Sequence, residues 1–372
     1  MFCMLKHLAP IRSRSLVALL LIAAAGGSLT GCYYLQAAAG QLALTAGSRP
    51  IERLIADPAT PEKLRERLAY VLEVRSFAVS ELGLPDNDSY RSYVTLDRPF
   101  VIWNVFATDR YSVVPRTWCF PVAGCVVYRG YFDWQAAERA ALRIRMRGGD
   151  AMVAGAAAYS TLGHFDDPVL STMMRWSDSQ LAATLFHELA HQVIYVPDDA
   201  AFNEAFATVV EEAGLERWLT ARGREAELDA WRRSRLQDEE FTQLLLATRR
   251  RLAGLYATER GEEALRTGKQ RILGELKYQY GLLRDTWDGY AAYDAWFERA
   301  LNNAHFVPFA TYHQCMPGFV RLFADAGGDF TEFYAAVNRV AALPATQRSA
   351  QLCGEDGARV SQRAADRSAR SR

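Results

Sequence analysis

Two histidines and a glutamate in the stretch HELAH have the spacing of a metal site with its own base. His187 and His191 are four residues apart, so on a helix both imidazoles lie on one face and can bind the same ion. Imidazole nitrogens suit Zn²⁺ at about 2.0–2.1 Å. Glu188 lies one position round the helix, where it can take a proton from a water that the metal activates. The motif predicts one zinc ion with Glu188 as general base.

A catalytic zinc site needs a third protein ligand and an open position for water. Glu204 is the best candidate, because the first helix can end at Val196–Pro197 and Asp199 can begin a second that brings Glu204 to the histidines. Glu211 or Glu212 could instead supply the ligand. Glu211 lies seven residues after Glu204 on the same helical face, so it can also hydrogen-bond a ligating histidine.

The elements that must position these residues are mostly helical. Apolar residues recur at helical spacing over residues 33–57, 60–83 and 133–148, and β-branched and aromatic runs predict several strands over 93–132 and a further one after 150. Residues 215–299 are rich in charge and leucine, which predicts a long antiparallel helical pair broken near Gly261. We therefore expect a mostly α protein of α+β class, with a small N-terminal sheet and long C-terminal helices.

The domain expectation is one domain over residues 32–360. Its N-terminal helices and sheet occupy about 32–150, the helices of the metal site about 178–214, and the helical C-terminal part about 215–345. Residues 361–372 are polar and basic without apolar spacing, which predicts a disordered tail.

Charge and composition exclude a nucleic-acid binder. The chain has 43 basic and 43 acidic residues, and no basic stripe stands out in its sequence. Half of its 372 residues are hydrophobic, enough to bury a substantial core.

The first 31 residues are typical of an export signal, with a basic start, an apolar run over residues 16–25 and small residues after it. Ten apolar residues are too few to span a bilayer, which takes about 20. The run ends in Leu29-Thr30-Gly31-Cys32, which resembles a bacterial lipobox, where the cysteine after the cleavage site is acylated. We expect lipid on Cys32 to hold the protein on a membrane of the cell envelope. Tyr33 after it favours the outer membrane, facing the periplasm.

Of the six cysteines, Cys3 leaves with the signal and Cys32 takes the lipid, so four remain, an even number that suits an oxidising compartment. Proximity pairs Cys119 with Cys125 and leaves Cys315 with Cys353, although four cysteines allow three connectivities.

Several stretches together resemble a known family. HELAH followed by Asn203-Glu204 resembles the gluzincin metallopeptidases, in which an Asn-Glu pair on the next helix supplies the third ligand, although their interval between histidine and glutamate is usually longer than the twelve residues here. Stretches such as WCFPVAGCVVYRGYF and FNEAFATVVEE resemble a bacterial family of predicted zinc aminopeptidases, mostly lipoproteins. The resemblance favours Glu204 as third ligand, places Asn203 beside the ligands with Glu211, and implies peptide hydrolysis.

A peptidase also needs a donor that stabilises the oxyanion of the attacked carbonyl. Tyr312, flanked by His305 and His313, is our candidate, and Tyr159 and Tyr131 are the alternatives. The stretch GHFDDP, with His164, is best explained as a turn that caps the next helix.

The sequence therefore predicts a membrane-anchored zinc aminopeptidase that acts on peptides. The alternatives are an envelope endopeptidase and an inactive zinc-bearing scaffold lipoprotein. An aminopeptidase must bind a free amino terminus, typically with a carboxylate, and the sequence does not choose among the four candidates Glu73, Asp86, Asp88 and Asp167.

Overall fold

The computed structural model describes residues 33–120, 124–161, 165–258, 260–313 and 315–353, without the side chains of 311–313. The chain divides into two compact units, Met1–Gly47 and Ser48–Arg372. The described part of the first unit is a helix over residues 33–47. The expected signal peptide, Cys32 and the C-terminal tail lie outside the described residues. Among those that are described, no helix is both long and apolar enough to cross a membrane.

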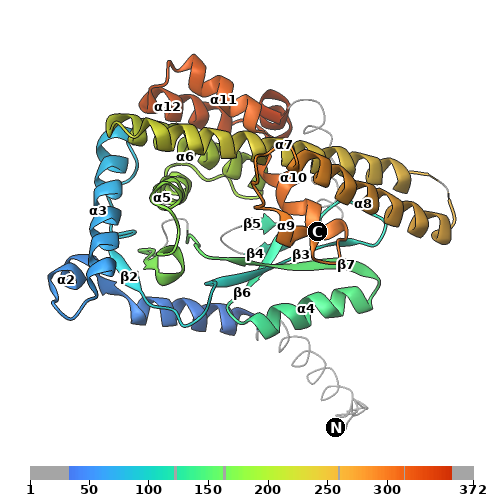
Figure 1. Cartoon of the computed structure of the whole chain (residues 1–372), viewed down its shortest axis with the longest axis horizontal. Helices are drawn as coiled ribbons and strands as arrows, with labels where there is room; N and C mark the ends of the chain where they lie inside the picture. Colours follow the sequence, from blue (N-terminus) through green and yellow to red (C-terminus); the bar gives the residue numbers. More distant parts are fainter. Residues whose placement is uncertain (1–32, 121–123, 162–164, 259, 314, 354–372) are drawn as a thin grey trace, which may run out of the picture. The chain divides into compact units, whose positions relative to one another are not determined.

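The second unit is mainly helical with small sheets, which confirms the expected fold class (Figure 1). Its longer helices are α3 (Glu62–Leu82), α4 (Trp134–Met146), α5 (Asp178–Val193), α6 (Ala200–Ala221), α7 (Glu225–Tyr256), α8 (Glu262–Arg284), α11 (Met316–Asp325) and α12 (Phe330–Ala341). The shorter ones are α2 (Ile51–Ala56), α9 (Asp294–Phe297), α10 (Val307–His313) and the 3₁₀ turns η1 (Ser171–Met173) and η2 (Asn303–Phe306). Residues 345–353 are also helical.

The strands form three small sheets. The largest is antiparallel, in the order β6 (Tyr128–Tyr131), β3 (Ile102–Asp109), β7 (Gly149–Ala156). The others are β1 (Arg49–Pro50), β2 (Ser92–Val94) and β8 (Val169–Leu170) in one sheet, and the hairpin of β4 (Trp118–Phe120) with β5 (Gly124–Val126).

The two faces of the largest sheet are covered by different helical segments. Side chains alternate along β3, so Trp103 and Phe106 point to opposite faces. The Trp103 ring meets Trp134 of α4 at a centroid distance of 6.3 Å, while Phe106 packs with Ala304 of η2 and Val307 of α10. The sheet is thereby fixed between α4 and the η2–α10 segment.

Helices α5 and α6 begin at residues that the sequence marks as caps. Ser177 accepts a hydrogen bond from Gln180 N and caps α5, and Asp199 accepts one from Phe202 N and caps α6. The expected start of the second helix at Asp199 is confirmed. α6 is buried on most of its surface, because it packs against α5, α7, α10 and α11.

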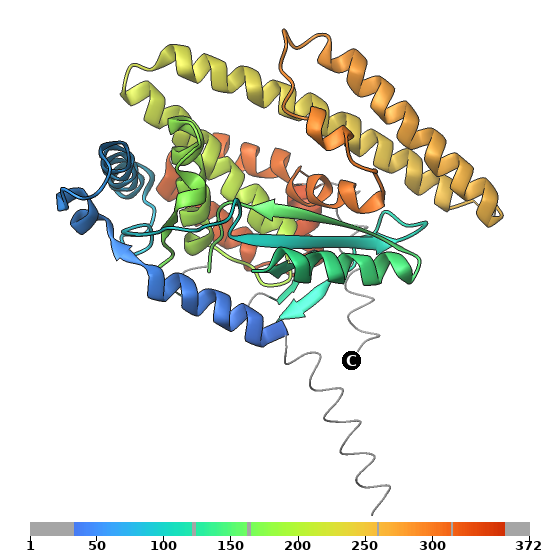
Figure 2. The same ribbon diagram turned by 60° about the horizontal axis from the view of Figure 1, so that its bottom comes forward.

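The expected charged pair of helices is α7 and α8 (Figure 2). Gly261 is the N-cap residue of α8. The two helices enclose an aromatic cluster around Phe241, whose ring stacks on Tyr293 at 3.7 Å between centroids. Their charged side chains remain largely on the outside, as expected for a solvated face.

Both disulfides that the sequence favours are present in the structure. Cys119–Cys125 closes the β4–β5 hairpin, and Cys315–Cys353 joins the start of α11 to the last helical segment.

The side chain of Asp199 has a second function besides its cap. Its Oδ2 atom accepts a hydrogen bond of 2.7 Å from Nε of Arg348, whose side chain is only 8% exposed. Asp199→Ala should therefore lower the free energy of unfolding by about 3–5 kcal/mol, because it leaves a buried guanidinium without its carboxylate and also removes a cap. Urea denaturation followed by circular dichroism measures this change. Asp329→Ala, which removes the exposed cap of α12, is the matched control and should cost only about 1 kcal/mol; equal losses would contradict the buried role of Asp199.

Candidate metal centre and active site

His187 and His191 lie one turn apart on α5 and face the same way. Their ring centroids are 4.8 Å apart, and both Nε2 atoms point toward Glu204 of α6. Both residues lie in a helix whose other face is filled by Leu181, Leu185 and Leu189. The buried face of α5 thus fixes the direction of the two imidazoles.

Glu204 completes a group of three ligands. Its Oε2 atom is 3.4 Å from Nε2 of His187 and 3.8 Å from Nε2 of His191, and the three ligand atoms all lie within 4.8 Å of one another. In a tetrahedral site with bonds of about 2.0–2.1 Å, neighbouring ligand atoms are about 3.3–3.4 Å apart. The two nitrogens and the oxygen therefore have suitable donor chemistry and lie close enough together to hold one metal ion.

The short connection between His191 and Glu204 is long enough for the helices to meet, because a compact loop joins them. The buried side chain of Asn203 donates to Val196 O and accepts from Val196 N, each at 2.8 Å. Asp198 adopts a left-handed conformation with φ of 68°, and its Oδ1 accepts a hydrogen bond from Cys125 N at 2.5 Å. Asn203 thus contacts the loop between the ligands, and the disulfide hairpin supports that loop from outside.

Glu211 and Glu212, the alternative ligands, have other partners. The Oε2 atom of Glu211 lies 2.9 Å from Nδ1 of His187, the ring nitrogen on the other side from Glu204. This is the carboxylate–histidine–metal arrangement that orients a ligating imidazole. Glu212 points to α7, where Arg235 donates to it at 2.9 Å. Of Glu204, Glu211 and Glu212, only Glu204 has its carboxylate close to Nε2 of both histidines.

Burial and neighbouring carboxylates set the electrostatics of the histidines. Burial lowers the pKa of His187, but hydrogen bonds and charges from Glu204 and Glu211 outweigh it and raise the pKa well above its ordinary value. Burial lowers the pKa of His191 to about 4, despite the nearby charge of Glu204. The carboxylate of Glu204 is also buried, yet its hydrogen bond to His187 and the charges of both histidines lower its pKa. The group concentrates negative charge where a cation would bind.

Glu188 is buried beside the two histidines, and its pKa lies near neutrality. Burial raises its pKa to about 7; the charge of His187 opposes this shift, and Glu204, Asp167 and Glu211 add to it. A carboxylate with that pKa exchanges protons easily at neutral pH. Its position on α5, beside the ligand pair, agrees with the role that the motif predicts.

A loop before β2 brings Tyr90 toward Glu188. Gln192, one turn after Glu188 on α5, hydrogen-bonds Asn87 at 2.7 Å and Ser89 at 3.2 Å. Tyr90 follows with φ of 61°, is 1% exposed, and donates its N–H to Asp167 O at 2.6 Å. Burial, together with the charges of Glu188 and Asp167, raises the pKa of its hydroxyl well above the usual value. Sequence reasoning missed Tyr90, because the stretch PDNDSY signals only a turn.

The tyrosines expected from the sequence are placed differently. Tyr159 lies beside Asp167, whose charge adds to burial in raising its pKa. Tyr131 lies beside Arg129 and Arg143 instead, on β6. The side chain of Tyr312 is outside the described residues; its helix, α10, packs against α6.

Of the four carboxylates considered for an amino terminus, Asp167 is the one whose charge acts on Glu188. Its oxygens accept hydrogen bonds from Thr161 N at 2.9 Å and Thr161 Oγ1 at 2.7 Å. Glu73 and Asp86 instead pair with arginines outside the site, and Asp88 is 80% exposed. His164 lies outside the described residues. The predicted helix cap at Asp166-Asp167-Pro168 is wrong, because strand β8 follows directly and Asp167 binds Thr161 instead.

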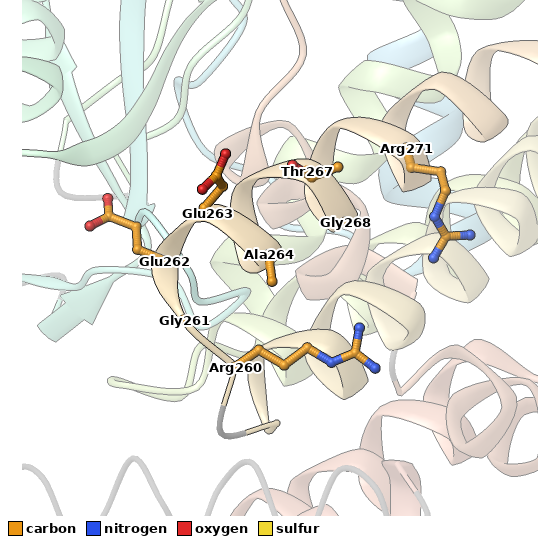
Figure 3. Close-up of a pocket in the computed structure, with 8 residues that line it drawn as sticks. All are labelled: Arg260, Gly261, Glu262, Glu263, Ala264, Thr267, Gly268 and Arg271. Atoms are coloured by element: carbon orange, nitrogen blue, oxygen red, sulfur yellow. The ribbon is translucent and has the colours of Figure 1, made fainter.

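A separate depression of about 690 Å³ opens at the start of α8 (Figure 3). It is lined by Arg260, Gly261, Glu262, Glu263, Ala264, Thr267, Gly268 and Arg271. None of the expected site residues is among them, and in Figure 3 Glu262 and Arg271 point to opposite sides. The chemistry is therefore concentrated at the α5–α6 pair.

Fold and site together define an α+β protein with a largely buried His–His–Glu group that can hold a metal ion, beside a further glutamate, Glu188. Residues 32–352 match the family model described as "Putative aminopeptidase", and the chain belongs to this family of peptidases. No curated protein and no solved structure gave a significant match to the chain.

The geometry assigns different functions to two adjacent carboxylates on α6. If His187, His191 and Glu204 hold a metal ion, Glu211→Ala should weaken its binding by about 10–100-fold, because it removes the partner that orients His187. Glu212→Ala removes a carboxylate of the same kind that faces Arg235, and it should change the metal affinity by less than about threefold. Competition with a chelating dye measures both affinities. A larger loss in the Glu212 variant would contradict the assignment.

Proposed function

We propose that the protein is a zinc-dependent aminopeptidase held on a membrane by lipid on Cys32. The observation that carries the proposal is the placement of His187, His191 and Glu204 around one point, with Glu188 alongside. Membership of a peptidase family supports peptides as the substrates.

In this proposal the three ligands hold one zinc ion, which supplies Lewis-acid polarisation of the groups bound to it. Glu188 accepts the proton of the attacking water and then delivers it to the leaving amine. Glu211 keeps Nδ1 of His187 engaged, so that Nε2 faces the ligand group. Burial of the site strengthens each of these interactions, since the local dielectric constant is low.

The envelope location rests on separate features. The two disulfides suit an oxidising compartment such as the periplasm. The basic and apolar start of the chain and Cys32 suit export followed by acylation. We infer that the mature protein lies on the outer membrane and faces the periplasm.

Glu188→Gln tests the catalytic base. The amide keeps the size of the side chain but cannot accept the proton, so kcat should fall by about 10²–10⁴-fold while zinc remains bound at one per chain. Peptide hydrolysis and elemental analysis give the two readouts. Glu216→Gln, the same change on an exposed part of α6, is the control and should keep full activity. Wild-type activity in the Glu188 variant would reject the mechanism, and a zinc-loaded wild-type protein without any activity would favour the inactive scaffold.

Paired peptides with free and acetylated amino termini test the exopeptidase assignment. An aminopeptidase needs the positive charge of the terminal amine, so acetylation should abolish cleavage and the free peptide should lose residues one by one. Mass spectrometry of the products follows both. Equal cleavage of the two peptides would instead identify an endopeptidase.

A further inference from the structure

The outer face of α4 combines exposed apolar side chains with a row of arginines. The helix packs on the largest sheet through small residues, Ala137, Ala140 and Ala141, which are buried. The opposite face is exposed along its whole length, and α4 lies at the edge of the second unit in Figure 1. This face is therefore available to something outside the chain.

Two neighbouring rows make up the face. Residues four apart lie close to one another on a helix, so one row contains Leu142 and Met146, which are 50% and 78% exposed, while Trp134 at the start of α4 packs on Trp103 of the sheet. The adjacent row contains Arg139, Arg143 and Arg147, all exposed, with Arg147 as the C-cap. The remaining member of the apolar row, Glu138, is paired with Arg145 at 3.4 Å. The two rows thus present apolar and cationic groups side by side.

The nearby acids leave most of this positive charge uncompensated. Asp133 caps α4 through Ala136 N and lies 3.6 Å from Arg139, while Arg143 and Arg147 have no ion pair among the described residues. A helix that displays basic and apolar side chains on the same exposed face is suited to the interface of a lipid bilayer with anionic headgroups. The long stems of arginine can lie along the apolar residues while their charged groups reach phosphates.

The chain start would keep the second unit close to a membrane. Cys32 is separated from the second unit, which begins at Ser48, by the helix over residues 33–47. Fifteen helical residues span only about 22 Å. A protein acylated at Cys32, as in the proposed function, would then have its second unit within tens of ångströms of the lipid headgroups, where weak surface contacts become effective.

We propose that the outer face of α4 lies on the surface of the bilayer, where Arg139, Arg143 and Arg147 bind anionic phospholipid headgroups and Leu142 and Met146 enter the interface. The proposal uses the anchoring part of the proposed function but not its catalytic part. It gives the anchored protein a defined orientation on the membrane.

A polarity-sensitive fluorophore on Met146→Cys, in the whole chain as cells process it, tests the contact. With vesicles containing phosphatidylglycerol, the emission should shift to the blue and be quenched by lipid-borne quenchers; vesicles of phosphatidylcholine alone should give a much smaller shift. The same fluorophore on Leu236→Cys, a 67% exposed position on α7, should remain in water throughout. The unsubstituted protein controls for labelling of the native cysteines.

The arginines are tested by changing all three to glutamine in the Met146→Cys protein. Each basic residue near an anionic surface contributes about fivefold to association, so the vesicle concentration for half-maximal shift should rise on the order of a hundredfold. Changing Arg232, Arg266 and Arg271 to glutamine removes the same charge elsewhere and should have little effect.

Three outcomes would overturn the proposal. The first is a fluorophore at residue 146 that stays in water, and the second is an equal loss of vesicle binding in the two triple variants. The third is a blue shift that occurs without vesicles and grows with protein concentration, as expected for contact with a second copy. The fluorophore reports on α4 and not on the chain start. If cells leave Cys32 unacylated and the blue shift still occurs, the result supports the contact of α4 with the membrane and rejects the anchor at Cys32. Peptidase activity is not part of the readout, so failure of the catalytic proposal is recognised separately.

Discussion

The buried side chain of Asn203 holds the short loop between α5 and α6 in place. This loop brings His187, His191 and Glu204 together. The amide of Asn203 binds both the N–H and the carbonyl of Val196, so this loop residue has both of its backbone hydrogen-bonding atoms satisfied without water. Asp199 then starts α6 at once. Without this tight reversal, the four-residue spacing on α5 would place two imidazoles together but leave the carboxylate of Glu204 on a helix that could not reach them.

The charge of the site follows from that packing. Three carboxylates, of Glu188, Glu204 and Glu211, are placed around two imidazoles in a region where burial penalises each negative charge. Ions in such surroundings are stable only when they are paired or bind a metal. A divalent cation between His187, His191 and Glu204 would compensate more of this charge than protons can, which favours metal binding as the purpose of the group.

Local chemistry predicted much of this from the sequence. Helical spacing gave the shared face of His187 and His191, and the cap at Asp199 gave the start of the helix that carries Glu204. The hydrogen bond between Glu211 and a ligating histidine was predictable because Glu211 lies seven residues after Glu204, on the same face of its helix. Tyr90 could not be foreseen, since its left-handed backbone depends on contacts with Asp167 and α5 that are distant in the sequence. The same holds for the bond between Asp198 and the hairpin at Cys125, which joins segments 73 residues apart.

The burial of α6 on nearly all sides has a consequence for the order in which parts of the protein unfold. Phe202 and Phe206 fill the core on either side of Glu204 in the sequence, and both are fully enclosed, with Phe319 and Phe333 among their neighbours. Segments like this exchange their amide hydrogens only when the whole structure opens, whereas exposed loops exchange through local fluctuations. The ligand-bearing helices thus belong to the last part of the molecule to unfold, and the site keeps its geometry for as long as the core itself persists.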